Sequence, residues 1–135
     1  QGVELHGKHV GLIGFGGNGS ALAKLLLPFG VCISAYDPYL EDDAFFDGVT
    51  RAASLNEFVD AVNILSIHCP RTRETENMVG AAQFAQMKSS AYLVNCARGG
   101  IVDETALVAA LQSGGITAAG IDVFDVEAPQ GDSLG

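Results

Sequence analysis

The chain has 135 residues, of which 48% are hydrophobic, and a formal net charge of −9. This length fits one domain that buries about two-thirds of its unfolded surface, so the domain can fold without disulfide bonds or a structural metal. With only seven Lys and Arg, the charge argues against binding to nucleic acid or to an anionic membrane. No apolar run reaches the ~18 residues of a membrane span.

The three cysteines lie in or beside apolar runs and lack CxxC spacing. They are Cys32, Cys69 and Cys96. This usage predicts buried, reduced thiols and a cytoplasmic setting rather than a disulfide framework, and no metal site is predicted.

The first motif is a glycine-rich turn, Gly14-Phe15-Gly16-Gly17-Asn18-Gly19, which follows an apolar run at 9–13. Glycine supplies the backbone angles for a tight strand-to-helix turn, and its missing side chain lets a pyrophosphate approach. The next helix would direct its free N–H groups at the phosphates. The motif alone is weak evidence, because glycine turns also serve plain packing of a strand against a helix.

Asp37 strengthens this interpretation, because it closes the apolar run 31–36 and follows Gly19 by 18 residues. That spacing is close to the ~20 residues expected for a carboxylate that binds the adenosine ribose. Between them, a helix is predicted over 18–29, closed by Pro28 and Gly30. Its buried stripe is predicted to comprise Ala21, Leu22, Leu25, Leu26 and Phe29.

Further strands are predicted near 49–52, 62–67, 92–95 and 118–123. A short helix is expected from the capping-box spacing at 54–57, another helix near 81–87, and a third that begins at Asp103 and stops at Gly114. This alternation predicts one α/β domain over 1–135, a doubly wound (Rossmann) parallel sheet with helices on both faces, in three layers α/β/α.

Polar residues gather at or just after the carboxyl ends of the predicted strands, where such sheets bind ligands. Arg98 lies between Ala97 and two glycines, which leaves its guanidinium free to grip a carboxylate bidentately. Asp122, inside an apolar strand, needs donors from a structural network or from a cofactor. The position of Glu127 in the sequence alone indicates only an acidic residue at the surface. The whole set is Asp37, His68, Asn95, Arg98, Asp122 and Glu127.

Together these motifs resemble the cofactor domain of the D-isomer-specific 2-hydroxyacid dehydrogenases. The most specific parts are the runs 93–104 and 120–124 followed by Glu127, supported by 66–70 and 36–38. The resemblance implies an NAD-dependent oxidoreductase that acts on a small 2-hydroxy or 2-keto acid, with a homodimeric parent. Arg98 would bind the substrate carboxylate and the reacting carbonyl, and Glu127 would orient a catalytic histidine.

The resemblance also implies which residues hold NAD: the turn at the pyrophosphate, Asp37 at the adenosine ribose, and Asp122 facing the nicotinamide carboxamide. Asp37 would repel a 2′-phosphate, which predicts a preference for NAD over NADP. The implied cofactor-binding residues are Gly14, Gly16, Gly17, Asn18, Gly19, Asp37, His68, Cys69, Pro70, Thr75, Ala97, Arg98 and Asp122.

Two departures from the family pattern matter. The family usually carries an arginine and a branched apolar residue where this chain has Gly17 and Asn18. The catalytic histidine expected beyond Glu127 and the separate substrate domain are not in these residues, so we expect a fragment of an enzyme. Two alternatives stay open, a dehydrogenase-like NAD sensor resembling the C-terminal-binding-protein corepressors, and a formate or phosphite dehydrogenase.

Overall fold

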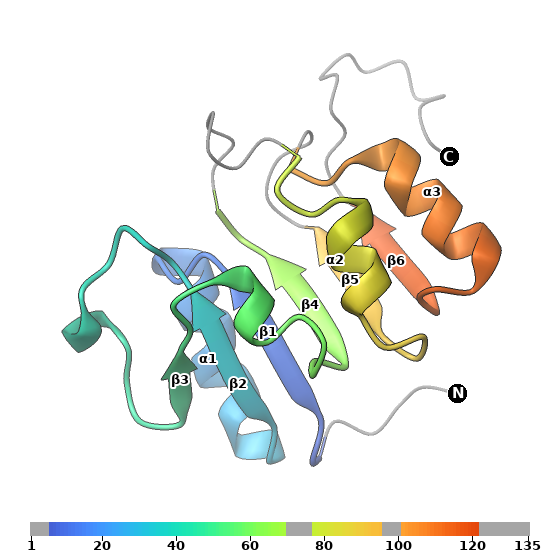
Figure 1. Ribbon diagram of the computed structural model, residues 1–135. Helices are drawn as coiled ribbons and strands as arrows, with labels where there is room; N and C mark the ends of the chain where they lie inside the picture. Colours follow the sequence, from blue (N-terminus) through green and yellow to red (C-terminus); the bar gives the residue numbers. More distant parts are fainter. Residues whose placement is uncertain (1–5, 70–76, 96–100, 122–135) are drawn as a thin grey trace.

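The computed structural model describes residues 6–69, 77–95 and 101–121, in which strands and helices alternate (Figure 1). The strands are β1 (His9–Ile13), β2 (Cys32–Tyr36), β3 (Val49–Arg51), β4 (Ile64–Ile67), β5 (Tyr92–Asn95) and β6 (Ala118–Ile121). The α-helices are α1 (Gly17–Leu26), α2 (Ala81–Gln86) and α3 (Glu104–Ser113). Three single turns of 3₁₀ helix are η1 (Leu27–Phe29), η2 (Asp42–Ala44) and η3 (Leu55–Glu57).

The six strands form one parallel sheet in the order β3-β2-β1-β4-β5-β6. The chain winds outward from β1 in one direction through β2 and β3, and then in the other through β4, β5 and β6. The strand order therefore reverses between β1 and β4, which is the position where doubly wound sheets bind ligands. The carboxyl ends of β1, β2 and β4 meet at this position, and the predicted doubly wound sheet is confirmed.

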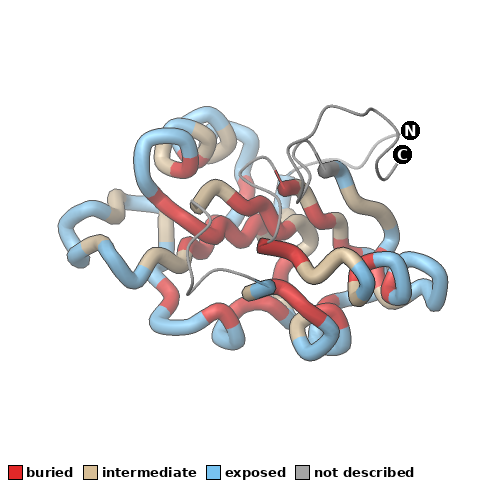
Figure 2. Tube along the Cα trace, turned by 90° about the horizontal axis from the view of Figure 1, so that it is seen from above, coloured by how far each residue is buried: buried red, intermediate tan, exposed pale blue. Residues whose placement is uncertain are grey.

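Helices cover both faces of the sheet, as predicted. α1 lies on one face, whereas η3, α2 and α3 lie on the other (Figure 1). Neighbouring residues of β1 enter separate cores: Leu12 belongs to the core that includes Ala23 of α1, and Ile13 to the core that includes Phe58 and Phe84. Buried residues concentrate in the central sheet and exposed residues on the outer sides of the helices (Figure 2).

The predicted stripe of α1 is confirmed for Leu22 and Leu26, which pack against the core, and is wrong for Ala21, Leu25 and Phe29. Gly19 and Ala23 are the buried residues of the helix and Leu22 and Leu26 are half-buried. Leu25 is 69% exposed, and Ala21 and Phe29 are exposed as well. The reason is close packing at the start of the helix, where a Cβ on Gly19 would lie 2.2 Å from the carbonyl oxygen of Gly14. The smallest residues therefore face the sheet, and the helix is rotated away from the stripe of largest side chains.

The other helix predictions hold, with one change. α3 begins after Asp103, whose carboxylate accepts a hydrogen bond from the Ala106 N–H at 3.2 Å, and it ends at Gly114 with φ +79°. The 54–57 segment forms only the 3₁₀ turn η3, since the Glu57 carboxylate accepts the N–H of Ala53 and not that of Ser54. Leu55 in this turn, and Phe58 and Val59 directly after it, are buried.

The prediction of buried thiols is wrong for Cys32, which occupies the first position of β2 and is exposed. Cys69 is a partly buried free thiol, and Cys96 lies outside the described residues. In the described part of the chain, no helix is long and apolar enough to cross a membrane. No group of three or more potential metal ligands is found within the same residues.

Candidate functional site

Three chain segments are tied together at the carboxyl edge of the sheet. The N–H of Gly14 donates to the carbonyl of Tyr36 at 2.8 Å, which joins the end of β1 to the end of β2. The N–H of His68 donates to the carbonyl of Ile13 at 2.7 Å, which joins the end of β4 to the same turn. The structure therefore brings together the predicted residues of the glycine turn, Asp37, His68 and Cys69.

The glycines of the turn fall into two kinds. Gly14 has φ +95°, and a Cβ there would lie 2.8 Å from the backbone nitrogen of Cys69. A Cβ on Gly19 would collide with the Gly14 carbonyl. These two glycines are required by close backbone packing. At Gly16 and Gly17, by contrast, a Cβ would meet no atom of the described residues within 4 Å, so that part of the chain leaves the backbone there open.

The amino end of α1 borders the same space without a side-chain cap. Its N-cap residue is Gly16, which makes no side-chain hydrogen bond, and no acidic residue lies in the first turn. The Ser20 hydroxyl donates backward to the carbonyl of Gly16 at 2.8 Å and so does not cap the helix. Because the first N–H groups of a helix lack intrahelical acceptors and carry its positive dipole end, this end favours an anion.

Asp37 is held rigidly by two backbone donors. One carboxylate oxygen accepts the N–H of Phe15 at 2.9 Å, and the other accepts the N–H of Tyr39 at 3.1 Å. A carboxylate offers about four acceptor directions, so each oxygen keeps one for a further donor. The half-buried Asp37 side chain thus presents a fixed pair of acceptors beside the turn.

The end of β4 contributes uncharged groups. The Nε2 atom of His68 lies 2.8 Å from the Ser66 hydroxyl, and burial lowers the pKa of the imidazole, which favours the neutral form. Burial also raises the pKa of the Cys69 thiol to about 11, partly offset by a backbone hydrogen bond, and the negative charge of Asp37 raises it further. His68 and Cys69 are therefore neutral at pH 7.

An aromatic cluster supports the turn, and sequence reasoning missed it. Phe15 is buried and stacks on Phe45, with ring centroids 4.9 Å apart, and also contacts Phe46. Arg51 lies over the Phe45 ring at 5.5 Å and forms an ion pair with Asp42. Phe45 and Phe46 belong to the acidic segment that follows Asp37, for which no element is predicted from the sequence. The two consecutive phenylalanines within it were the available signal that it packs against the turn.

The other predicted site residues lie outside the described residues: Pro70, Thr75, Ala97, Arg98, Asp122 and Glu127. Among the strand-end residues, Asn95 at the end of β5 is 1% exposed.

The comparisons with known proteins agree with this architecture. Residues 1–134 match the family model described as the D-isomer specific 2-hydroxyacid dehydrogenase, NAD binding domain. The chain is 42% identical to a D-3-phosphoglycerate dehydrogenase from Methanocaldococcus jannaschii over 135 residues, which are 99% of this chain and 26% of that protein. It is 41% identical over 129 residues to a hydroxypyruvate reductase from Thermotoga maritima, which covers 96% of this chain and 41% of that protein.

A solved structure leads to the same family. The NAD complex of a D-isomer specific 2-hydroxyacid dehydrogenase from Lactobacillus delbrueckii ssp. bulgaricus superposes with a TM-score of 0.84 at 41% identity. The match covers 90% of this chain and 36% of that one. The chain thus spans well under half the length of these relatives. Since the family model matches nearly every residue, the chain belongs to the NAD-binding domains of the D-isomer specific 2-hydroxyacid dehydrogenases.

Proposed function

We propose that the carboxyl edge around the β1–α1 turn is where this domain holds NAD. The backbone of 16–19 would bind the pyrophosphate, and Asp37 would accept hydrogen bonds from the adenosine ribose hydroxyls. The observation that carries the proposal is the open space at Gly16 and Gly17 directly before the uncapped end of α1. The remaining acceptor direction on each Asp37 oxygen suits a pair of hydroxyl groups.

His68 and Cys69 would line the adenine side of the site as neutral groups. Gly14 and Gly19 would act by allowing the turn, β4 and α1 to pack closely, and Asn18 would contribute its backbone. The family resemblance adds Pro70, Thr75, Ala97 and Asp122 to the cofactor contacts. The bound cofactor would accept a hydride as NAD or donate one as NADH. These residues would fix the position of the cofactor.

For the protein to which this domain belongs, we propose hydride transfer between NAD(H) and a D-2-hydroxy acid or 2-keto acid. Arg98 would bind the substrate carboxylate in two-pronged geometry and stabilise charge on the reacting oxygen. Glu127 would orient a histidine supplied from outside residues 1–135, which moves the proton. A homodimer and a cytoplasmic setting belong to the same proposal.

The two alternatives are not favoured, because the curated relatives matched by sequence include D-3-phosphoglycerate dehydrogenases and a hydroxypyruvate reductase. The scaffold itself does not separate the formate alternative, since formate dehydrogenases at 36% and 33% identity are among the similar solved structures. An NAD-sensing corepressor would bind the dinucleotide without turnover. A formate or phosphite dehydrogenase would use other substrate contacts on the same scaffold. Both alternatives are separated from the proposal by substrate tests on the complete protein.

Cofactor binding is tested on the 135-residue chain by fluorescence titration with NADH and NADPH. We expect tighter binding of NADH, because Asp37 repels a 2′-phosphate. Asp37→Asn keeps the shape and removes the charge, so the preference should shrink mainly through better NADPH binding. Asp60→Asn, at an exposed position before β4, is the matched control and should leave both affinities unchanged. Equal affinities in the unsubstituted chain would contradict the assignment of Asp37.

Catalysis is tested in the complete protein with pyruvate, glyoxylate, hydroxypyruvate and phosphohydroxypyruvate in the presence of NADH, and with formate or phosphite in the presence of NAD. We expect NADH-dependent reduction of a 2-keto acid and no NAD-dependent oxidation of formate or phosphite. Arg98→Lys should lower kcat/KM by ~10²-fold, because lysine keeps the charge and loses the bidentate geometry. The affinity for NADH should change little. Unchanged kcat/KM would remove Arg98 from the substrate site.

A further inference from the structure

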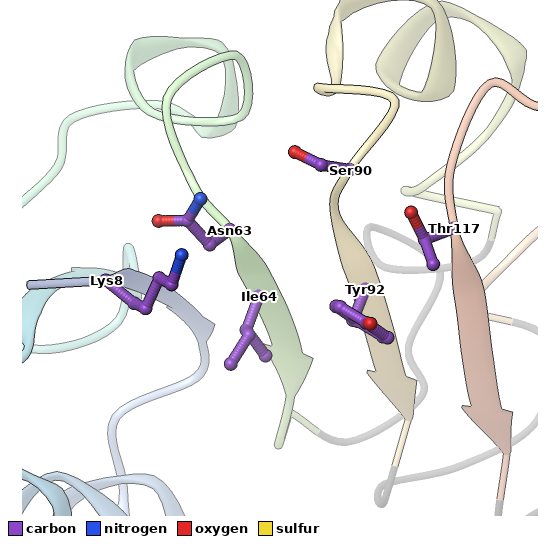
Figure 3. Close-up of a pocket in the computed structure, with 6 residues that line it drawn as sticks. All are labelled: Lys8, Asn63, Ile64, Ser90, Tyr92 and Thr117. Atoms are coloured by element: carbon purple, nitrogen blue, oxygen red, sulfur yellow. The ribbon is translucent and has the colours of Figure 1, made fainter. Parts of the chain in front are cut away.

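A second concave site lies at the amino edge of the sheet, opposite the glycine turn. It has a volume of about 200 Å³ and is lined by residues that precede or begin four strands. Figure 3 shows these residues around one opening, with Ile64 and Tyr92 on the strands. The lining residues are Lys8, Asn63, Ile64, Ser90, Tyr92 and Thr117.

Two nitrogen donors meet at one side of this pocket. The side-chain oxygen of Asn63 accepts the N–H of His9 at 2.8 Å, and this bond fixes the amide so that its NH₂ group is the free end. The ammonium of the half-buried Lys8 lies near the Asn63 side chain (Figure 3) and forms no ion pair with any of the described residues. Both groups are donors that line the pocket, and none of its six lining residues is acidic, so an anion or a carbonyl oxygen would complement them.

The far side of the pocket carries hydroxyl groups. Ser90 is exposed and its hydroxyl faces the pocket across from Asn63 (Figure 3). The Thr117 hydroxyl donates to the carbonyl of Ser89 at 2.8 Å, so Thr117 is held in place and only its lone pairs remain. The half-buried Tyr92 and Ile64 form an apolar floor between the two sides.

The charge around the pocket differs from that of the chain. The chain carries 16 Asp and Glu against seven Lys and Arg, yet none of the six lining residues is acidic. A second lysine, Lys88, lies near His9. Burial is the main cause of the lowered pKa of His9, and the positive charge of Lys88 is the second cause. His9 directly follows Lys8, so both lysines act on the same end of the sheet.

We propose that this pocket is a binding site for a small anion with a carboxylate or phosphate group. Lys8 forms the ion pair, and the Asn63 amide and the Ser90 hydroxyl donate hydrogen bonds to the same group. The volume is below the ~300–1,000 Å³ of pockets for drug-sized ligands, so a dinucleotide is excluded and a small metabolite fits. The site is independent of the proposed NAD site at the other edge.

The test is an amide chemical-shift titration of the 135-residue chain with sodium phosphate and, separately, with sodium malonate. Sodium chloride keeps the ionic strength constant in both series. We expect saturable shifts at residues 63–64, 90–92 and 117 with at least one of the two anions. Saturation by phosphate alone or by malonate alone identifies which group the pocket accepts. Shifts without saturation, or shifts confined to 16–19, would overturn the proposal.

Variants link those shifts to the pocket. Lys8→Met should raise the apparent Kd about tenfold or more, because a charge-assisted hydrogen bond is lost. Ser90→Asp, at an exposed position, places a carboxylate in the pocket and should abolish saturation. Lys24→Met removes the same charge from exposed α1 and should leave the Kd within about twofold. Equal affinities for Lys8→Met and the unsubstituted chain, with folding verified by the amide spectrum, would refute the site.

Discussion

The contact between Gly19 and the Gly14 carbonyl is the tightest constraint on the β1–α1 turn, and Gly19→Ala tests it. A Cβ at position 19 would lie 2.2 Å from that oxygen, about 0.8 Å short of the 3.0 Å below which real Cβ contacts essentially never occur. The oxygen belongs to the backbone, so it cannot rotate away. Either α1 must move as a body or the turn must open.

The cost follows from the size of that movement. Overpacking a tight site costs typically 1–3 kcal/mol, and a rigid backbone neighbour places this case near ~3 kcal/mol. Alanine inside a helix returns ~0.5–1 kcal/mol relative to glycine. The free energy of unfolding should therefore fall by ~2 kcal/mol, which corresponds to ~8 °C in Tm for a domain of this size.

Gly17→Ala is the matched control, since it makes the same chemical change two residues earlier in the same helix. A Cβ there meets nothing within 4 Å, so only the helix preference acts and Tm should rise by ~2 °C. Thermal and urea unfolding of both variants, followed by circular dichroism, give the comparison. A Gly19→Ala protein as stable as the unsubstituted chain would refute the close approach of α1 to the turn.

Three further outcomes are expected. In mass-spectrometric mapping of alkylation at pH 8, the exposed Cys32 should react well before Cys69, whose pKa of about 11 leaves about one thiolate in a thousand; equal rates would contradict the burial of Cys69. Burial chiefly lowers the folded-state pKa of His9 and of His68 below 6.5, so the unfolded state takes up protons first. The free energy of unfolding should then fall as the pH drops below 6.5 and level off once the pH is below the folded-state pKa values. Urea unfolding at a series of pH values measures this dependence. His68→Gln should make the free energy of unfolding depend less steeply on pH, and an unchanged dependence would contradict the contribution of His68. Gly17→Arg should tighten NADH binding several-fold, by ~1 kcal/mol, because it places a cation beside the proposed pyrophosphate site; weaker binding in isothermal titration would contradict that position for the pyrophosphate.

The sheet was predictable from the sequence because its strands are short apolar runs separated by clear helix signals. Asp103 and Gly114 marked both ends of α3 correctly, since a capping carboxylate and a left-handed glycine are local requirements. The doubly wound fold followed from the alternation of strands and helices. The strand order then brought the glycine turn, Asp37 and His68 to one edge, as the position of each residue at a strand end implied.

The errors share a different cause. The orientation of α1 depends on how closely its backbone approaches the turn, and hydrophobic periodicity reports side-chain size and not backbone distance. The Phe15 and Phe45 stack joins residues that are far apart in the sequence, so no local pattern reveals it. Cys32 is apolar by type but occupies the exposed start of β2. In each case a tertiary contact, or its absence, decided the outcome.

The glycine turn shows why a sequence motif alone leaves binding undecided. Gly14 and Gly19 are required by the packing of the chain against itself, and they would be needed in a turn that binds nothing. No packing contact among residues 6–69, 77–95 and 101–121 requires glycine at Gly16 or Gly17, because a Cβ at either position meets nothing within 4 Å there. The backbone at these two positions is therefore open to a group that approaches from outside. The case for a ligand therefore rests on the open backbone at Gly16 and Gly17. Stability should respond to substitutions at Gly14 and Gly19, and NADH affinity to the side chain placed at position 17.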